Sequence, residues 1–279
     1  MNDLKEKSII AITWNLIERF GTRIIQLIAG VVIARLLLPE EYGLIAMSSV
    51  FISISTIFVS GGFGLAYVQK KQVSIYDANT VFYTNIIVSI IIYSSLWISA
   101  PLISKFYGYS SLTIIIRLMS LNLFFNAFSS IQRAILKKEI DFKSLSTANL
   151  IGVIFSSLAG IIAANFNMGA YSLIFQQLIG SFLSATILWI KSSWRPKWIY
   201  SKESLKSLFN FGGWIFLSTL LNKVFDNIYK LFIGKFYPAQ DLGFYDKARN
   251  YQLLPTHIFI GAVGSVSFPI ISKLQDENE

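Results

Sequence analysis

Cysteine is absent from this 279-residue chain, and charged residues are scarce. The absence of cysteine excludes a disulfide scaffold and thiolate metal sites, although it says nothing about the redox compartment. Charged residues make up 14% of the chain, whereas a soluble domain carries roughly a quarter. So little charge cannot coat a globule in which 54% of the residues are hydrophobic. The composition therefore predicts a membrane protein.

The chain also lacks the residue patterns of an enzyme. Paired catalytic carboxylates, zinc-ligand spacing and a nucleophile motif are all missing, so no enzymatic activity, metal or cofactor is predicted. The only histidine, His257, lies in an apolar stretch, where a hydrogen-bonded packing role is favoured over proton coupling. Gly61-Gly62-Phe63-Gly64 follows no predicted strand, so it indicates close helix packing rather than a phosphate loop.

Long apolar runs are abundant. A helix that crosses the hydrocarbon core needs about 20 mainly apolar residues. The first run is too long for the apolar region of a signal peptide, and no small-residue cleavage site follows it. The short corners between the runs favour antiparallel neighbours, so we predict an all-α polytopic membrane protein. Its eight transmembrane helices are expected at 8–37, 42–67, 78–104, 111–136, 144–166, 169–191, 208–236 and 250–272.

The basic residues are distributed unevenly over the predicted loops. With the N-terminus inside, the inner loops hold 14 of the 24 Lys and Arg residues and the outer loops hold 5. This bias predicts that both termini are cytoplasmic. The net charge of +9 is then a topology signal that faces anionic membrane lipids, and no nucleic-acid partner is expected.

An outer corner, Pro39-Glu40-Glu41-Tyr42-Gly43, occurs twice. Pro39 suits the first turn of a helix, and the two acids suit its positive N-terminus. A shift of 200 residues aligns Glu41 with Asp241 and Gly43 with Gly243. It also aligns Gly61, Gly64, Arg35 and Arg23 with Gly261, Gly264, Lys235 and Lys223.

Six helices separate the two copies, so the repeat is parallel and predicts two lobes. The first six-helix transmembrane lobe is expected at 1–191, and a basic cytoplasmic linker at 192–207. Residues 208–279 would then form the first two helices of an incomplete second lobe.

Polar residues follow one face of two of these apolar helices. On the first helix they are Asn15, Glu18, Arg19, Thr22, Arg23 and Gln26. On the seventh they are Thr219, Asn222, Lys223, Asp226 and Lys230. An ionised side chain at mid-membrane costs about 2.5–3.5 kcal/mol, so these stripes are predicted to face protein or a hydrated cavity.

The two stripes allow different interpretations. On the seventh helix Asp226 has the spacing to pair with Lys223 and Lys230, so self-neutralisation and a cavity role stay equally open. On the first helix Arg19 and Arg23 are like charges one turn apart, and a cavity role is favoured. The predicted substrate-binding cavity therefore comprises Arg19, Arg23, Glu18, Asn15, Gln26, Lys223, Asp226 and Asn222. Four amides, Asn122, Asn126, Gln176 and Gln177, either line a cavity or bond between helices.

Three ordered stretches resemble one protein family. They are Arg35-Leu-Leu-Leu-Pro-Glu-Glu-Tyr-Gly43, Gly234-Lys235 continuing to Leu242-Gly-Phe-Tyr-Asp-Lys-Ala248, and Phe268-Pro-Ile-Ile-Ser-Lys-Leu-Gln-Asp276. Together they resemble the Wzx-like polysaccharide flippases of the multidrug/oligosaccharidyl-lipid/polysaccharide exporter superfamily. The resemblance covers essentially the whole chain, but such flippases have twelve to fourteen helices, so the chain is interpreted as truncated.

The resemblance implies a function and its partners. It implies outward transport of undecaprenyl-diphosphate-linked oligosaccharide for lipopolysaccharide or exopolysaccharide synthesis, by alternating access in the bacterial cytoplasmic membrane. Basic residues of the first helix would line a cationic cavity for the diphosphate, and by position these are Arg19 and Arg23. The implied partners are the lipid-linked anionic oligosaccharide, membrane lipids and the polysaccharide assembly machinery.

Three alternatives remain open. A cation-coupled drug exporter of the same superfamily would favour a carboxylate-dominated cavity. A membrane-embedded glycosyltransferase or polymerase would favour a sizeable polar loop with acids or histidine. A truncated, non-transporting remnant or assembly partner is favoured by the missing helices.

Overall fold

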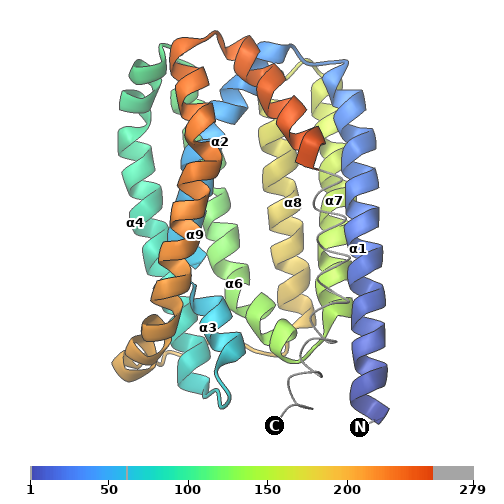
Figure 1. Cartoon of the computed structure of the whole chain (residues 1–279), viewed down its shortest axis with the longest axis vertical. Helices are drawn as coiled ribbons and strands as arrows, with labels where there is room; N and C mark the ends of the chain where they lie inside the picture. The colour runs from blue at the N-terminus through green and yellow to red at the C-terminus, as the bar shows by residue number, and fades with distance from the viewer. Residues whose placement is uncertain (1, 61, 254–279) are drawn as a thin grey trace, which may run out of the picture.

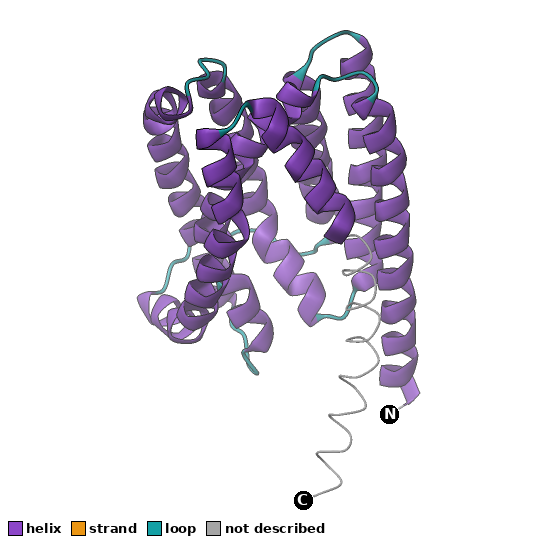
Figure 2. Cartoon of the chain, turned by 45° about the horizontal axis from the view of Figure 1, so that its top comes forward, coloured by secondary structure: helices purple, strands orange, loops and turns teal. Residues whose placement is uncertain are grey.

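The computed structural model describes residues 2–60 and 62–253, which form a helical bundle that contains no strand (Figure 1). Figure 2 shows only helices and short connecting loops in this part of the chain. Residues 239–253 are also helical and follow a non-helical connection at Tyr237 and Pro238. The preceding helices are α1 (Asn2–Ala34), α2 (Pro39–Ser60), α3 (Phe63–Gln69), α4 (Ile75–Tyr107), α5 (Leu112–Ser120), α6 (Asn122–Lys138), α7 (Phe142–Asn165), α8 (Ala170–Lys191) and α9 (Lys202–Phe236).

The acidic corner caps the start of α2. Pro39 is its first helical residue, a position where the missing N–H costs no hydrogen bond. The backbone N–H of Leu38 donates to Glu41 Oε2 at 2.8 Å, which is the reverse half of a capping box. The predicted placement of the two acids at a helix N-terminus is therefore confirmed.

The segment between α8 and α9 is hydrogen-bonded to the start of α4. Ser74 and Asp77 form a capping box there, and Asp77 pairs with Lys70 at 2.8 Å. The backbone N–H of Lys197 donates to Asn79 Oδ1 at 2.6 Å, and that of Ser201 donates to Thr80 Oγ1 at 3.1 Å. Since α9 begins at Lys202, the last residues of the predicted linker 192–207 are helical.

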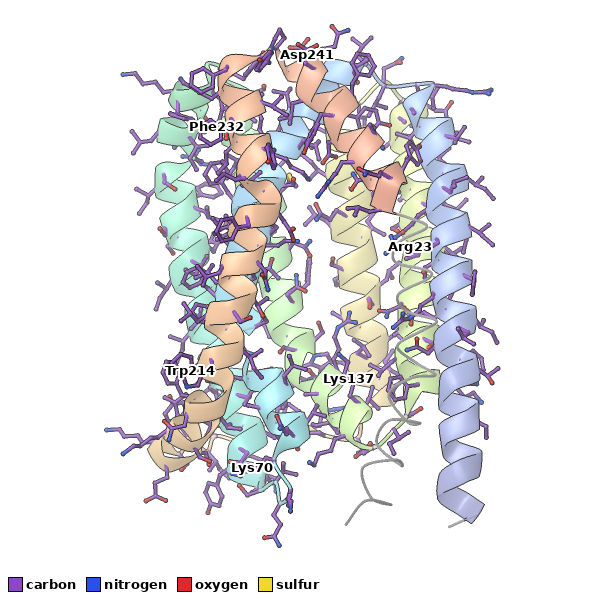
Figure 3. The ribbon with its side chains drawn as sticks, in the orientation of Figure 1. Arg23, Lys70, Lys137, Trp214, Phe232 and Asp241 are labelled. Carbon is purple, nitrogen blue, oxygen red and sulfur yellow. The ribbon has the colours of Figure 1, made fainter. Side chains whose placement is uncertain are left out.

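The helices gather in two groups that α6 joins. In Figure 1 α1, α7 and α8 stand on one side, and α2, α4 and α9 stand on the other. Helix α7 packs against α1 and α8, whereas α9 packs against α2, α3 and α4. Helix α6 contacts α2 and α4 as well as α7 and α8. Figure 3 labels Lys70 at the end of the bundle where α1 begins and Asp241 at the opposite end, and we name the two ends after these residues.

Five helical stretches of the described residues are long and apolar enough to cross a membrane. They coincide with the spans predicted at 42–67, 78–104, 111–136, 144–166 and 169–191. Their outer faces carry exposed apolar side chains, among them Ile98 at 74% and Leu102 at 70%. Helices α1 and α9 occupy the spans predicted at 8–37 and 208–236, and both carry charges midway. The last predicted span, 250–272, lies almost entirely outside the described residues, as do His257 and Phe268–Asp276.

A reciprocal glycine contact joins two helix starts at the Asp241 end. A Cβ atom on Gly43 would collide with the backbone carbonyl of Ala239, and one on Gly243 would collide with that of Pro39. A shift of 200 residues relates Gly43 to Gly243 and Pro39 to Ala239, so each contact is the counterpart of the other. A local two-fold axis makes contacts of this pattern. The same shift carries the start of α1 onto the start of α9 and Pro39 onto Ala239, where the next helix begins. Gly61, Gly261 and Gly264 are outside the described residues.

Candidate functional site

A polar cavity of about 380 Å³ lies among α1, α6, α7 and α8. We call it the arginine cavity because Arg19, Arg23 and Arg133 line it. The rest of its wall consists of Glu18, Thr22, Gln26, Asn149, Gly152, Val153, Gly180, Ser181 and Ser184. Val153 contributes the only apolar side chain of this lining, so the cavity is a polar pocket within an apolar bundle.

Two glycines in the wall of the arginine cavity bring α7 and α8 close together. A Cβ on Gly152 of α7 would lie 3.0 Å from the carbonyl oxygen of Gly180 on α8. A Cβ on Gly180 would in turn lie 3.1 Å from the Cβ of Ser156. Small residues of this kind let two membrane helices approach closely, so α7 and α8 pack at backbone distance in the wall of the cavity.

Arg19 and Arg23 face this cavity from one side of α1. Figure 3 shows Arg23 on the side of α1 that faces the interior of the bundle. Both residues are exposed rather than packed against other side chains. Within the described part of the chain neither has a carboxylate within ion-pair distance, and the ion pairs found there are Lys70–Asp77 and Lys230–Asp246. The cavity therefore holds two positive charges, one turn apart, that no carboxylate of residues 2–60 or 62–253 neutralises.

The third arginine is held in a network that joins four helices. Arg133 of α6 donates through Nη1 to Asn149 Oδ1 at 3.0 Å and through Nη2 to Ser184 Oγ at 2.9 Å. Asn149 of α7 donates through Nδ2 to Glu18 Oε1 at 3.0 Å. Ser184 of α8 also donates to Asn149 Oδ1, at 3.2 Å. Glu18 is thus committed to Asn149, which connects it to Arg133 rather than to Arg19 or Arg23.

The structure brings four of the eight predicted cavity residues together: Glu18, Arg19, Arg23 and Gln26. Asn15 lies earlier on α1 and is half-buried outside the lining. The other three predicted residues, Asn222, Lys223 and Asp226, lie on α9 in the opposite helix group and do not line this cavity.

In the described part of the chain, no ion pair joins two residues of the polar stripe of α9. Lys230 pairs with Asp246 of the following helix at 2.5 Å, so this lysine binds a different acid from Asp226. Asn222 and Asp226 are exposed, and Asn227 donates through Nδ2 to the carbonyl oxygen of Lys223 at 2.8 Å. Of the two helices, only α1 presents unpaired cations to the arginine cavity.

A second cavity of about 230 Å³ lies among α2, α3, α6 and α9, and we call it the α9 cavity. Arg133 lines this cavity as well as the arginine cavity, and Lys137 stands one turn further along α6. Asn126, one of the four unassigned amides, and Thr219, from the polar stripe of α9, also line it.

Sequence reasoning assigned Arg133 only to the positive charge near an inner loop. A signal for its role exists in the spacing of Asn126, Ser130, Arg133 and Lys137, which places four polar side chains on one face of α6.

Comparison with known proteins shows the family of the chain. The sequence profile of a family described as "Polysaccharide biosynthesis protein" matches residues 32–279. The chain belongs to this family.

Curated relatives of the chain are named for polysaccharide synthesis or transport. The teichuronic acid biosynthesis protein TuaB of Bacillus subtilis is 24% identical over 95% of this chain and 55% of its own length. The succinoglycan biosynthesis transport protein ExoT of Rhizobium meliloti is 20% identical over 95% and 54%. The lipopolysaccharide biosynthesis protein WzxC of Escherichia coli is 23% identical over 99% and 56%. The chain thus spans about half the length of these relatives.

A solved structure has the same fold. It is an inward-facing multidrug resistance transporter of the MATE family in the MOP superfamily, which superimposes with a TM-score of 0.61 over 91% of this chain and 64% of its own. The sequences are 14% identical, so the likeness concerns the fold alone. With its five apolar spans and this fold, the family member described here is an integral membrane protein.

Proposed function

We propose that this chain carries undecaprenyl-diphosphate-linked oligosaccharide across the bacterial cytoplasmic membrane for surface polysaccharide synthesis. The arginine cavity receives the diphosphate, and Arg19 and Arg23 bind its oxygens. The single observation that carries the proposal is the pair of unneutralised arginines in a polar cavity within an apolar bundle. An arginine fork suits phosphate geometry, and its hydrogen bonds to an ionised partner are about twice as strong as neutral ones.

The proposal includes an architecture of eight crossings with both termini in the cytoplasm. Residues 1–191 form the first lobe, 192–207 the cytoplasmic linker and 208–279 two helices of a second, parallel lobe. Support comes from the coincident starts of α1 and α9 under the 200-residue shift and from the reciprocal contact of Gly43 and Gly243. Since the relatives are about twice as long, further helices complete the second lobe in a carrier of their size.

Transport by alternating access is part of the same proposal. The Asp241 end is closed by backbone contact between the helices that start at Pro39 and Ala239. The α9 cavity includes Val68 of α3 and Lys137, both near the Lys70 end. A closed end opposite two cavities is the arrangement of a carrier that loads from one side, here the cytoplasm.

Transport is tested with liposomes that contain the purified chain and a fluorescent undecaprenyl-diphosphate-linked sugar. A quencher that cannot cross the membrane then reports how much lipid reaches the other leaflet. We expect the variant with both Arg19→Gln and Arg23→Gln to move the lipid at least about tenfold more slowly, because two charge-assisted hydrogen-bond donors are lost.

Arg35→Gln is the matched control, because Arg35 is exposed after the end of α1 and lines neither cavity. Unchanged transport by the double variant would contradict the proposed site. Movement of a cationic dye in place of the lipid would favour the drug exporter, although one carboxylate and three arginines suit a cation poorly. Failure of the unaltered chain to move any lipid would favour the non-transporting alternative.

A further inference from the structure

We propose that the α9 cavity binds the apolar part of an amphiphilic substrate, namely the isoprene unit next to the diphosphate. The arginine cavity then holds the charged and sugar-bearing part, and Arg133 stands at the junction. This inference rests on the proposed function, which it deepens by assigning a place to the lipid. Nothing about a lipid site follows from the polar stripes of α1 and α9 alone.

The walls of the two cavities differ in chemistry. The arginine cavity has one apolar side chain, Val153. Seven apolar side chains line the α9 cavity: Ile57, Val59, Leu65, Val68, Ala134, Ile215 and Phe216. The Phe216 ring is itself fixed by an edge contact with Phe58, with the ring centroids 5.2 Å apart. A preformed apolar wall of this kind gains free energy by covering hydrocarbon, at about 25 cal/mol per Å².

Most polar groups of the α9 cavity are already used within the bundle. The hydroxyl of Thr56 donates to the Ile52 carbonyl at 2.8 Å, and that of Ser60 donates to the Ile57 carbonyl at 3.2 Å. Asn126 donates through Nδ2 to the Asn122 carbonyl at 2.9 Å. Ser130 Oγ accepts from Asn85 Nδ2 at 3.0 Å. These groups are satisfied by their own helices or neighbours, so an apolar ligand leaves them paired.

The charged side chains of the α9 cavity are Arg133 and Lys137 on α6. They lie four residues apart on one helix face, and Arg133 reaches the arginine cavity through Asn149 and Ser184. The order across the bundle is therefore an apolar wall, a pair of cations and a polar cavity. A prenyl diphosphate that carries a sugar has the same order of parts: hydrocarbon, anion and hydroxyl-rich glycan.

Calorimetric titration of the full chain in lipid nanodiscs tests this assignment with two probes, farnesyl diphosphate and inorganic diphosphate. We expect the unaltered chain to bind both, with higher affinity for farnesyl diphosphate. Val68→Thr keeps the shape of a half-buried wall residue but makes it polar, and Ile215→Thr introduces a hydroxyl on α9 while shortening the side chain by one carbon. Each is expected to weaken farnesyl diphosphate binding about 3- to 10-fold and to leave inorganic diphosphate binding unchanged.

Val224→Thr is the matched control, because Val224 is exposed on α9 and lines neither cavity. It is expected to change neither affinity. Equal weakening of both probes by Val68→Thr and Ile215→Thr, or no weakening of either, would overturn the lipid site while the anion site stands. If the unaltered chain binds neither probe, the proposed function fails and this inference fails with it.

Discussion

Arg133 lines both the arginine cavity and the α9 cavity. It is half-buried on α6, donates to Asn149 and Ser184, and is connected through Asn149 to Glu18. A charge within an apolar bundle is stable only when its hydrogen bonds and its counter-charge are supplied. Here Asn149 lies between Arg133 and the counter-charge, Glu18, so the two side chains do not pair directly. Arg133 therefore keeps hydrogen-bonding capacity for a ligand.

We expect Arg133→Gln to destabilise the protein by about 1–3 kcal/mol, because Glu18 loses its counter-charge within the bundle. Glu18→Gln is expected to destabilise it similarly, and the double variant by less than the sum. Thermal unfolding in detergent, followed by tryptophan fluorescence, measures the coupling. Additive effects of the two substitutions would show that Asn149 does not connect Glu18 with Arg133.

At the residue scale the sequence predicted the charges better than their partners. The i, i+3, i+4 spacing of Arg19, Thr22 and Arg23 predicted the cavity face of α1, because a helix places such residues on one side. It could not identify Asn149 or Ser184, which lie more than 100 residues away and reach the site only through packing. The pairing of Lys230 with Asp246 was missed for the same reason, since local spacing favoured Asp226.

Two helix starts pack against each other at the Asp241 end of the bundle. Gly43 and Gly243 each lie in the first turns of a helix that begins after a short non-helical connection. Each glycine packs against the first residue of the opposite helix, so the two helix starts cross at backbone distance. Any side chain at either position would separate them, because the obstacle is a carbonyl group and not a flexible side chain.

Gly43→Ala and Gly243→Ala are each expected to lower stability by about 1–3 kcal/mol, the usual cost of overpacking. Gly30→Ala on α1 is the control, because among the described residues a Cβ there would find only the Tyr251 hydroxyl, at 3.8 Å. That control should be neutral or stabilise by up to about 1 kcal/mol, because alanine favours a helix over glycine. Melting temperatures in detergent compare the three variants, and a stable Gly43→Ala protein would refute the backbone contact.

At the element scale the apolar runs located the helices that a membrane would surround. Composition alone did not reveal that 42–67 is two helices, α2 and α3, with Gly62 in the left-handed region at φ 70° between them. Nor did it reveal that 111–136 is divided into α5 and α6 at Leu121. Both divisions lie inside continuous apolar runs, where hydropathy has no boundary to detect.

The topology of the whole molecule is open to direct measurement, because the chain has no cysteine of its own. Ser110 and Ser193 are exposed in loops at opposite ends of the bundle. In intact bacteria, a maleimide that cannot cross the membrane should label Ser110→Cys and not Ser193→Cys. After permeabilisation both should react. Labelling of Ser193→Cys in intact cells would contradict a cytoplasmic linker.

At the scale of the whole molecule the sequence indicated two repeats but not the spaces between helices. The 200-residue shift depends on a few glycines and charges, and the structure adds matching helix starts and a matching contact. The cavities depend on how α6 stands between the two helix groups. That placement results from many weak contacts, and no motif encodes it.

Arg133 lines both cavities, so in the proposed carrier the occupancies of the two sites are thermodynamically linked. A ligand that draws Arg133 toward one side changes the affinity of the other, and the effect is equal in both directions. A hydrocarbon alone or an inorganic anion alone occupies one of the two cavities, whereas a molecule that joins a hydrocarbon to an anion occupies both. Selectivity for the joined molecule over the abundant free phosphates of a cell then requires no additional recognition element.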